Sequence, residues 1–148
     1  MRIKKFLSSL PQSVLNGDEI TLSLGSIRRL FEFAGLGSSD ILYLLGCGSS
    51  ESLRIAHDEF KVKKSVGVEI NKRRAMLAGE KVSQQQNAQI INRDMRKIDL
   101  LEATVIFFWL TDDKLIEQMI RKFEMELKDG VRLITIWSPL DLMTNFLS

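Results

Sequence analysis

Residues 40–50 read Asp-Ile-Leu-Tyr-Leu-Leu-Gly-Cys-Gly-Ser-Ser, and this stretch decides the fold of the chain. The apolar run from Ile41 to Leu45 predicts a buried strand, which ends at a Gly-Cys-Gly turn. We expect a helix to begin at Ser49 or Ser50, because a serine side chain accepts a hydrogen bond from a free amide of a first helical turn. The stretch therefore predicts a strand, a glycine turn and the start of a helix.

A second apolar run, residues 65–68, follows the predicted helix and leads directly to Glu69. The order of strand, glycine turn, helix, strand and acid is that of a nucleotide-binding βαβ unit. The glycines let a ligand approach the backbone, and the helix N-terminus offers free amides with a partial positive charge. The carboxylate of Glu69 can accept hydrogen bonds from two ribose hydroxyls, so the unit predicts a site for a nucleotide-type ligand.

The composition is that of a single globular domain. The chain has 148 residues, of which 45% are hydrophobic and 27% are charged, as in ordinary soluble proteins. A net charge of +2 gives no argument for a nucleic-acid partner, and a single cysteine favours a reducing, cytoplasmic location. No apolar stretch has the length of a secretory signal or a membrane span, so we expect no membrane partner.

Apolar runs and helical periodicities alternate along the rest of the chain. Residues 1–18 are mixed and are expected to form a short helix or an irregular arm. In the predicted third helix Met76 and Leu77 are expected to be buried, and Thr111 is expected to cap the fourth helix. The predicted strands are residues 41–45, 65–69, 88–91, 103–110 and 131–137, and the predicted helices are residues 24–34, 50–60, 72–83 and 112–127.

Five strands that alternate with helices predict an α/β fold with a doubly wound, mostly parallel sheet. Ligands of such sheets bind above the carboxyl ends of the strands. The Gly-Cys-Gly turn, Glu69, Asp94 and residues 109–111 all follow predicted strands directly. We therefore expect these four segments to converge on one ligand site.

A nicotinamide dinucleotide is the competing ligand for this site. Its G-x-G-x-x-G pattern needs a third glycine where Glu51 stands, and a carboxylate there would lie close to the diphosphate. We therefore disfavour a dinucleotide. No motif pairs Cys47 with a base, so we interpret this residue as an inert filler between two glycines rather than a nucleophile.

The motifs resemble those of the class I S-adenosylmethionine-dependent methyltransferases. Residues 40–48 resemble the first motif of that family, Asp-x-Gly-x-Gly-x-Gly at the end of the first strand, and Val-Gly-Val-Glu-Ile-Asn at residues 66–71 resembles the second. Asn-Arg-Asp at residues 92–94 resembles the loop that faces the adenine. Over residues 25–137 the chain resembles in particular the small archaeal protein-lysine methyltransferases. This resemblance implies a Rossmann-like methyltransferase fold, S-adenosylmethionine as cofactor, and protein lysine side chains as methyl acceptors.

The resemblance also implies a domain plan and a set of site residues. The plan is one methyltransferase-like domain with an N-terminal arm (1–23), a cofactor-binding core (24–137) and a short tail (138–148). The glycines would leave room for the methionine part of the cofactor, the acid would bind the ribose, and the loop after the third strand would flank the adenine. The implied cofactor-binding residues are Gly46, Cys47, Gly48, Glu69, Ile70, Asp94 and Met95. Trp109 and Thr111 are assigned to the substrate, and no catalytic residue or metal ligand is assigned.

The chain departs from the family pattern in three ways. Leu44 stands where the family has an acid that helps to organise the methionine end of the cofactor, and Ser50 stands where the family has a third glycine. The family also adds a sixth and a seventh strand, for which this chain has no room. The departures support an alternative function, that of a degenerate and catalytically inactive methyltransferase-like protein that acts as a binding or partner subunit.

The fifth predicted strand would then form an edge of the sheet. It begins at Val131, ends at Trp137 and is largely apolar. An apolar edge invites pairing with another chain unless it is covered. Unless the N-terminal arm or the tail covers it, we expect a homodimer or heteromer through this strand, in addition to a protein substrate.

Overall fold

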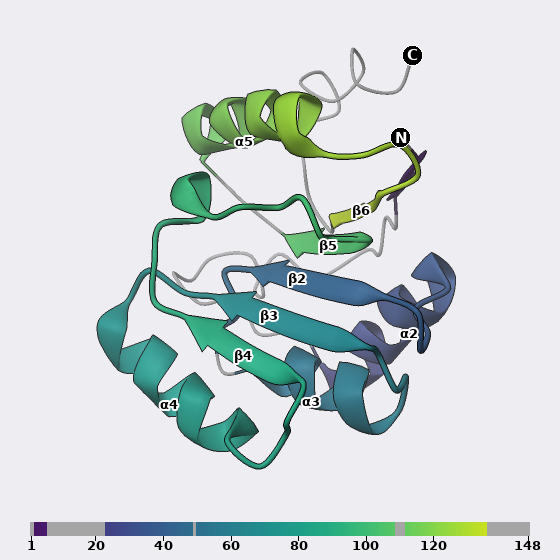
Figure 1. Ribbon diagram of the computed structural model, residues 1–148, viewed down its shortest axis with the longest axis vertical. Coiled ribbons are helices and arrows are strands. Elements are labelled where there is room, and N and C mark those ends of the chain that lie inside the picture. Colours follow the sequence, from purple (N-terminus) through teal and green to yellow (C-terminus); the bar gives the residue numbers. More distant parts are fainter. Residues whose placement is uncertain (1, 6–22, 49, 109–111, 136–148) are drawn as a thin grey trace.

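The computed structural model describes residues 2–5, 23–48, 50–108 and 112–135. Six strands, four α-helices and one 3₁₀-helix form this part of the chain (Figure 1). In chain order they are β1 (Arg2–Lys5), α2 (Leu24–Ala34), β2 (Ile41–Leu45), α3 (Glu51–Asp58), β3 (Lys64–Val68), α4 (Lys72–Val82), β4 (Ala88–Ile91), η1 (Met95–Lys97), β5 (Val105–Phe108), α5 (Asp113–Glu126) and β6 (Arg132–Thr135). No helix among the described residues is long and apolar enough to cross a lipid bilayer.

All six strands lie parallel in one sheet, in the order β1-β6-β5-β2-β3-β4. The chain runs outward from β2 through β3 to β4, then returns to β5 on the other side of β2 and runs outward again to β6. The direction of winding therefore reverses between β2 and β5, and the predicted doubly wound α/β fold is confirmed. In such a sheet the ligand site lies above the carboxyl ends of the strands at this reversal.

Helices cover both faces of the sheet, in three layers (Figure 1). Successive side chains of β2 point to opposite faces, so Leu42 and Leu44 belong to one core cluster and Tyr43 and Leu45 to the other. The first cluster is closed by α2, α3 and α4, and the second by α5 and the segment that follows η1. Because both of their faces are buried, the central strands β2 and β5 are continuous apolar runs, as the sequence indicated.

The N-terminal arm differs from the prediction. Residues 2–5 form strand β1, rather than a helix or an irregular arm, and β1 pairs with β6 so that Arg2 lies opposite Arg132. Strand β6 is therefore an inner strand between β1 and β5, so the prediction that it forms an edge of the sheet was wrong. The homodimer or heteromer was expected only if this strand stayed uncovered, so the reason for expecting it through residues 131–137 does not apply here. The alternative that the N-terminal arm covers this strand is confirmed.

Two local predictions about the helices were also wrong. Met76 and Leu77 are 58% and 45% exposed, because α4 packs on the sheet through small residues, with Ala75 and Ala78 buried instead. The N-cap of α5 is Asp112, whose side chain accepts a hydrogen bond from the Leu115 amide, so the cap lies one residue after the predicted Thr111. Thr111 itself lies outside the described residues.

A buried ion pair joins the amino ends of three strands to the end of α2. Asp40, only 5% exposed, accepts hydrogen bonds from the Gly37 amide at 2.9 Å and from the Thr104 hydroxyl at 2.8 Å, and it forms an ion pair with Arg132. Arg132 also donates to the carbonyl oxygen of Ala34 at 2.6 Å. One carboxylate thus fixes the C-terminus of α2 and the starts of β2, β5 and β6.

Replacing this carboxylate, Asp40→Ala, should lower the free energy of unfolding by roughly 3 kcal/mol, because it leaves the partly buried Arg132 guanidinium without its partner. Urea denaturation measures the change. The control is Glu59→Ala, which removes the exposed partner of Arg28 and should change stability much less, because solvent screens that pair. Equal losses in the two variants would show that the Asp40 ion pair has no special structural role.

Gly67 lies in the middle of β3, where neighbouring side chains approach the backbone closely. A Cβ atom at this position would lie 2.7 Å from Cδ1 of Leu53, 2.8 Å from Cδ1 of Ile90 and 3.0 Å from Cβ of Cys47. Helix α3 and the glycine turn therefore pack directly onto the backbone of β3. This contact explains why the second sequence motif has a glycine between two valines.

Gly67→Ala should therefore destabilise the protein by about 1–3 kcal/mol, since the added methyl group overpacks the core. Gly79→Ala is the matched control. Gly79 lies within α4 with open space around its Cα, so alanine there should raise stability by about 0.5–1 kcal/mol. Thermal unfolding of both variants tests the pair, and a neutral Gly67→Ala would contradict the close packing.

Candidate functional site

The glycine turn after β2 is fixed to the end of β3 by two backbone hydrogen bonds. The amides of Gly46 and Cys47 both donate to the carbonyl oxygen of Val68, at 2.8 and 3.0 Å. Gly46 has a φ of +81°, a conformation that side-chain-bearing residues rarely adopt. A Cβ on Gly46 would extend toward Cε of Met95, 4.0 Å away. The glycine therefore keeps open a space between the turn and the loop that contains Met95.

Glu69 lies directly after β3 and is buried, with 5% of its surface exposed. One carboxylate oxygen accepts a hydrogen bond from the Asn71 amide at 3.0 Å, and the other lies 3.5 Å from Nε of Arg74. The Glu69 amide donates to the carbonyl oxygen of Ile91, which ties this turn to the end of β4. Each carboxylate oxygen keeps lone-pair capacity for a further donor.

The loop after β4 is held beside the Glu69 turn. The side-chain amide of Asn92 donates to the carbonyl oxygens of Glu69 and Ile70, at 2.8 and 3.1 Å. Asp94 then caps η1 and accepts hydrogen bonds from the backbone amide and the guanidinium of Arg96. The side-chain hydrogen bonds from Arg96, followed by its backbone amide, lower the pKa of Asp94 to about 2. This carboxyl group is therefore ionised at neutral pH.

These loops enclose a pocket of about 110 Å³ at the carboxyl ends of the strands. Five of the seven predicted cofactor-binding residues line it, so the structure brings together most of the site that the sequence indicated. Four further lining residues were not predicted: Val68, Arg93, Arg96 and Leu115. The complete lining is Gly46, Val68, Glu69, Ile70, Arg93, Asp94, Met95, Arg96 and Leu115.

Two of the other predicted site residues, Cys47 and Gly48, do not line the pocket. Cys47 is 7% exposed and packs against Gly67 beneath the turn, outside the pocket lining. Burial is the main reason why the pKa of its thiol rises to about 12, and the carboxylate of Glu69 adds to this effect. Such a thiol stays protonated at neutral pH, in agreement with its interpretation as an inert filler. Gly48 is also absent from the lining, and Trp109 and Thr111 lie outside the described residues.

The two departures from the family motif have structural counterparts. Leu44 is 2% exposed and belongs to the core cluster beneath α2 and α3. Its side chain therefore packs in the core and makes no polar contact. Ser50 is the N-cap of α3, but it has a φ of +66° and its side chain makes no capping hydrogen bond. A glycine would adopt this left-handed conformation without strain. Ser50 therefore has the left-handed backbone conformation that suits the glycine of the family motif, although it is not a glycine.

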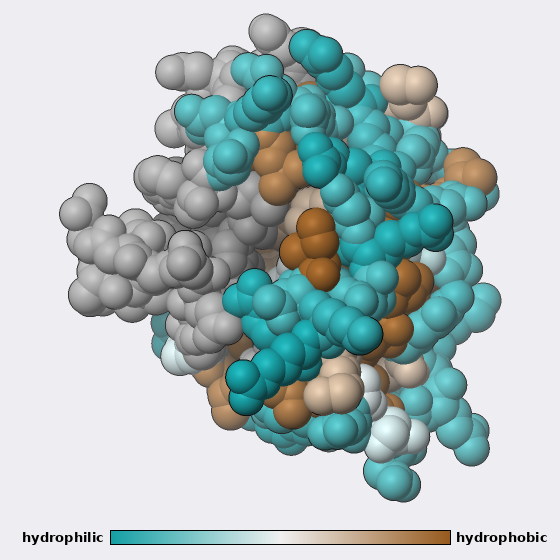
Figure 2. Space-filling model, turned by 90° about the vertical axis from the view of Figure 1, so that its left-hand side faces the viewer, coloured by the Kyte–Doolittle hydropathy of each residue, from teal (hydrophilic) through white to brown (hydrophobic). Residues whose placement is uncertain are grey.

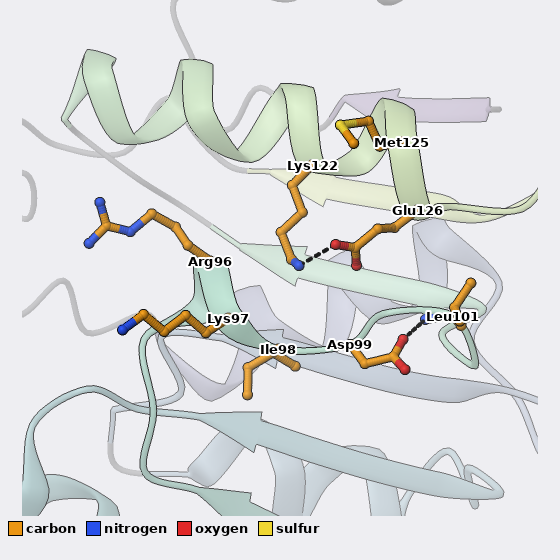
Figure 3. A pocket seen from close by; sticks show the side chains of 8 residues that line it. All are labelled: Arg96, Lys97, Ile98, Asp99, Leu101, Lys122, Met125 and Glu126. Carbon is orange, nitrogen blue, oxygen red and sulfur yellow. Dashed lines mark hydrogen bonds and ion pairs between the residues drawn. The ribbon is translucent and has the colours of Figure 1, made fainter.

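A second, larger hollow of about 430 Å³ lies between η1, the segment after it and the last turns of α5 (Figure 3). Lys122 and Glu126 form an ion pair across its wall at 2.5 Å. It shares Arg96 with the smaller pocket, but it contains neither the glycine turn nor Glu69. The smaller pocket therefore contains residues of both sequence motifs, whereas the lining of the larger hollow contains none.

The lining of the smaller pocket fits part of S-adenosylmethionine. The space beside Gly46 would be filled by a Cβ, Glu69 offers carboxylate oxygens for hydroxyl groups, and Val68, Ile70 and Met95 provide apolar walls. Its volume is below the roughly 300–1,000 Å³ of complete small-molecule sites. Ser49, within the glycine turn, and residues 109–111, which follow β5, lie outside the described residues.

Solved methyltransferase structures share this fold. An RNA methyltransferase from Salinibacter ruber, in complex with S-adenosyl-L-homocysteine, matches 78% of this chain and 76% of its own with a TM-score of 0.73 at 20% identity. A geranyl diphosphate C-methyltransferase from Streptomyces coelicolor matches 75% of this chain and 44% of its own, with a TM-score of 0.64 at 20% identity. The acceptors of these two enzymes differ, so the fold alone does not identify a methyl acceptor.

A sequence relative is much more similar. A protein-lysine N-methyltransferase from Saccharolobus islandicus is 35% identical over 127 residues, which cover 79% of this chain and 78% of the relative. No model of a known protein family matches the chain. The identity and its extent confirm the family that the motifs indicated. The chain belongs to the class I S-adenosylmethionine-dependent methyltransferase family, in the group of the archaeal protein-lysine N-methyltransferases.

Proposed function

We propose that this protein transfers a methyl group from S-adenosylmethionine to lysine side chains of other proteins. The observation that carries the proposal is the 35% identity to a protein-lysine N-methyltransferase over most of both chains. The pocket at the carboxyl ends of the strands supports it, because the motif residues Gly46 and Glu69 meet there. The single cysteine favours a cytoplasmic setting for the reaction.

Each part of the pocket has a role in this proposal. Glu69 binds the ribose hydroxyls, since its buried carboxylate lies at the end of β3 and keeps acceptor capacity. Gly46 leaves room for the methionine part, and Ile70 and Met95 enclose the adenine. Asp94 accepts from the adenine amino group in addition to Arg96, which requires the two donors to share one carboxylate. The proposal also assigns Gly48 to the cofactor. It assigns Trp109 and Thr111 to the acceptor lysine.

The bound cofactor supplies an electrophilic methyl group on a sulfonium centre. The protein must hold the acceptor amine in line with that group and exclude water. A neutral lysine amine is itself a sufficient nucleophile, so the reaction does not require a strong general base. We accordingly assign no catalytic base among the residues of the pocket.

A degenerate, partner-binding protein remains the second candidate because Leu44 provides no carboxylate for the methionine end of the cofactor. The edge-strand argument for that candidate is weaker than the sequence suggested, since β1 covers β6. The two candidates differ in a measurable way. Methyl transfer to a lysine peptide supports the enzyme, whereas cofactor binding without any transfer supports the degenerate protein.

Glu69→Gln tests the cofactor site. We expect the dissociation constant for S-adenosylmethionine to rise about 10- to 100-fold in calorimetry, because the charged acceptor of the ribose hydroxyls is lost. Glu80→Gln makes the same change at an exposed position of α4 and should leave the affinity unchanged. Thermal unfolding confirms that both variants are folded. An unchanged affinity in a folded Glu69→Gln variant would overturn the assignment of the site.

A further inference from the structure

Four basic residues without an assigned role lie in or next to the segments that line the pocket; Arg93 lines the pocket itself and Lys97 lines the larger hollow. They come from the first turn of α4, the loop after β4 and the end of η1. Within the described part of the chain, all four are exposed and none of their side chains makes a hydrogen bond or an ion pair. We call this set the basic rim: Lys72, Arg73, Arg93 and Lys97.

The basic rim is built from adjacent segments. Because the Asn92 side chain donates to the carbonyl oxygens of Glu69 and Ile70, the loop with Arg93 lies directly beside the turn that leads into Lys72 and α4. In Figure 3 the side chains of Arg96 and Lys97 extend in the same direction from η1. Figure 2 shows this end of the molecule, with apolar side chains in the middle of the described surface and strongly hydrophilic residues around them.

Local stability does not explain these charges. Lys72 and Arg73 occupy the first turn of α4, where the helix dipole disfavours cations, and no acidic residue compensates them there. The two acids of the pocket already have cationic partners, Arg74 for Glu69 and Arg96 for Asp94. The basic rim therefore carries positive charge in excess of what the site neutralises.

The side of the pocket at α5 carries charges of both signs. Leu115 of α5 lines the pocket, and it follows the exposed N-cap Asp112, Asp113 and Lys114. The segments of α4 and η1 thus present an excess of cations, whereas the start of α5 has two carboxylates and one ammonium group. An acceptor segment with the complementary arrangement would be oriented by these fields.

We propose that the basic rim binds acidic side chains that flank the acceptor lysine in the protein substrate. The inference rests on the proposed function and specifies its substrate class, which is a lysine in an acidic segment. Three of the rim residues, Lys72, Arg73 and Lys97, are exposed and are not among the residues that line the cofactor pocket. They should therefore affect the binding of the substrate segment and leave the affinity for the cofactor unchanged.

The test compares two fluorescently labelled peptides that each contain one lysine, flanked by glutamates in the first and by glutamines in the second. The triple variant Lys72→Gln, Arg73→Gln, Lys97→Gln is expected to bind the glutamate peptide about tenfold more weakly in fluorescence anisotropy, the combined effect of three exposed charge contacts. Its affinity for the glutamine peptide should not change. Added salt should reduce the difference between wild type and variant, because it screens exposed charges.

The control removes the same kind of charge from the other end of the sheet. Lys63 and Lys128 are exposed and precede β3 and β6, so the variant Lys63→Gln, Lys128→Gln should bind both peptides as the wild type does. Calorimetry with S-adenosylhomocysteine should give one affinity for wild type, triple variant and control. Cofactor affinity and methyl transfer test the proposed function, whereas peptide binding tests the basic rim. The proposed function and the further inference can therefore fail separately.

Three outcomes would overturn the inference. They are an equal loss for both peptides in the triple variant, no loss for either peptide, and the same loss in the control variant. A single-stranded RNA oligonucleotide provides the last comparison. If wild type binds it more tightly than the glutamate peptide and the triple variant loses that binding, the basic rim is a nucleic-acid surface instead.

Discussion

The carbonyl oxygen of Val68 accepts two successive amides, and the geometry of the site depends on this interaction. It fixes the exit of β2 against the end of β3, so the glycine turn and Glu69 hold one relative position. The absence of a side chain at Gly67, one residue earlier, lets α3 and the turn approach closely enough to form these bonds. Asn92 then joins the exit of β4 to the same place. Hydrogen bonds to backbone carbonyl oxygens thus tie three loops from three strands together before any ligand is considered.

The parts of the fold that depend on neighbours in sequence could be predicted. Strands β2 and β4 have the predicted bounds. For β2 the reason is that a continuous apolar run ended by turn residues suits a strand covered on both faces. Asn71 caps α4 as its position suggests, with its side chain accepting from the Arg74 amide. In the site, the glycine turn and Glu69 could be predicted from the sequence motifs alone. Their meeting in one pocket follows from the rule that parallel strands place their carboxyl ends at one edge.

The parts that depend on distant contacts were missed. Strand β1 has three basic residues among its four and no alternating pattern, so only its pairing with β6 makes it a strand. Met76 and Leu77 were predicted to be core residues because they are apolar, but α4 packs on the sheet through Ala75, Ala78 and Val82 instead. Arg96 enters the site because Asp94 and Gln118 of α5 hold its guanidinium. No local sequence pattern indicates that arrangement. No local pattern indicates that Leu115 of α5 lines the pocket either.

The position of β1 has a consequence for the order of folding. Its pairing with β6 joins Arg2 to Arg132, which closes a loop spanning most of the sequence. Closing so long a loop costs chain entropy, and contacts of this kind form late. Until β1 docks, β6 is an edge strand with free amides and carbonyls. A nascent or partly unfolded molecule would therefore expose the surface that the finished sheet conceals, and its tendency to aggregate would depend on how fast β1 reaches β6.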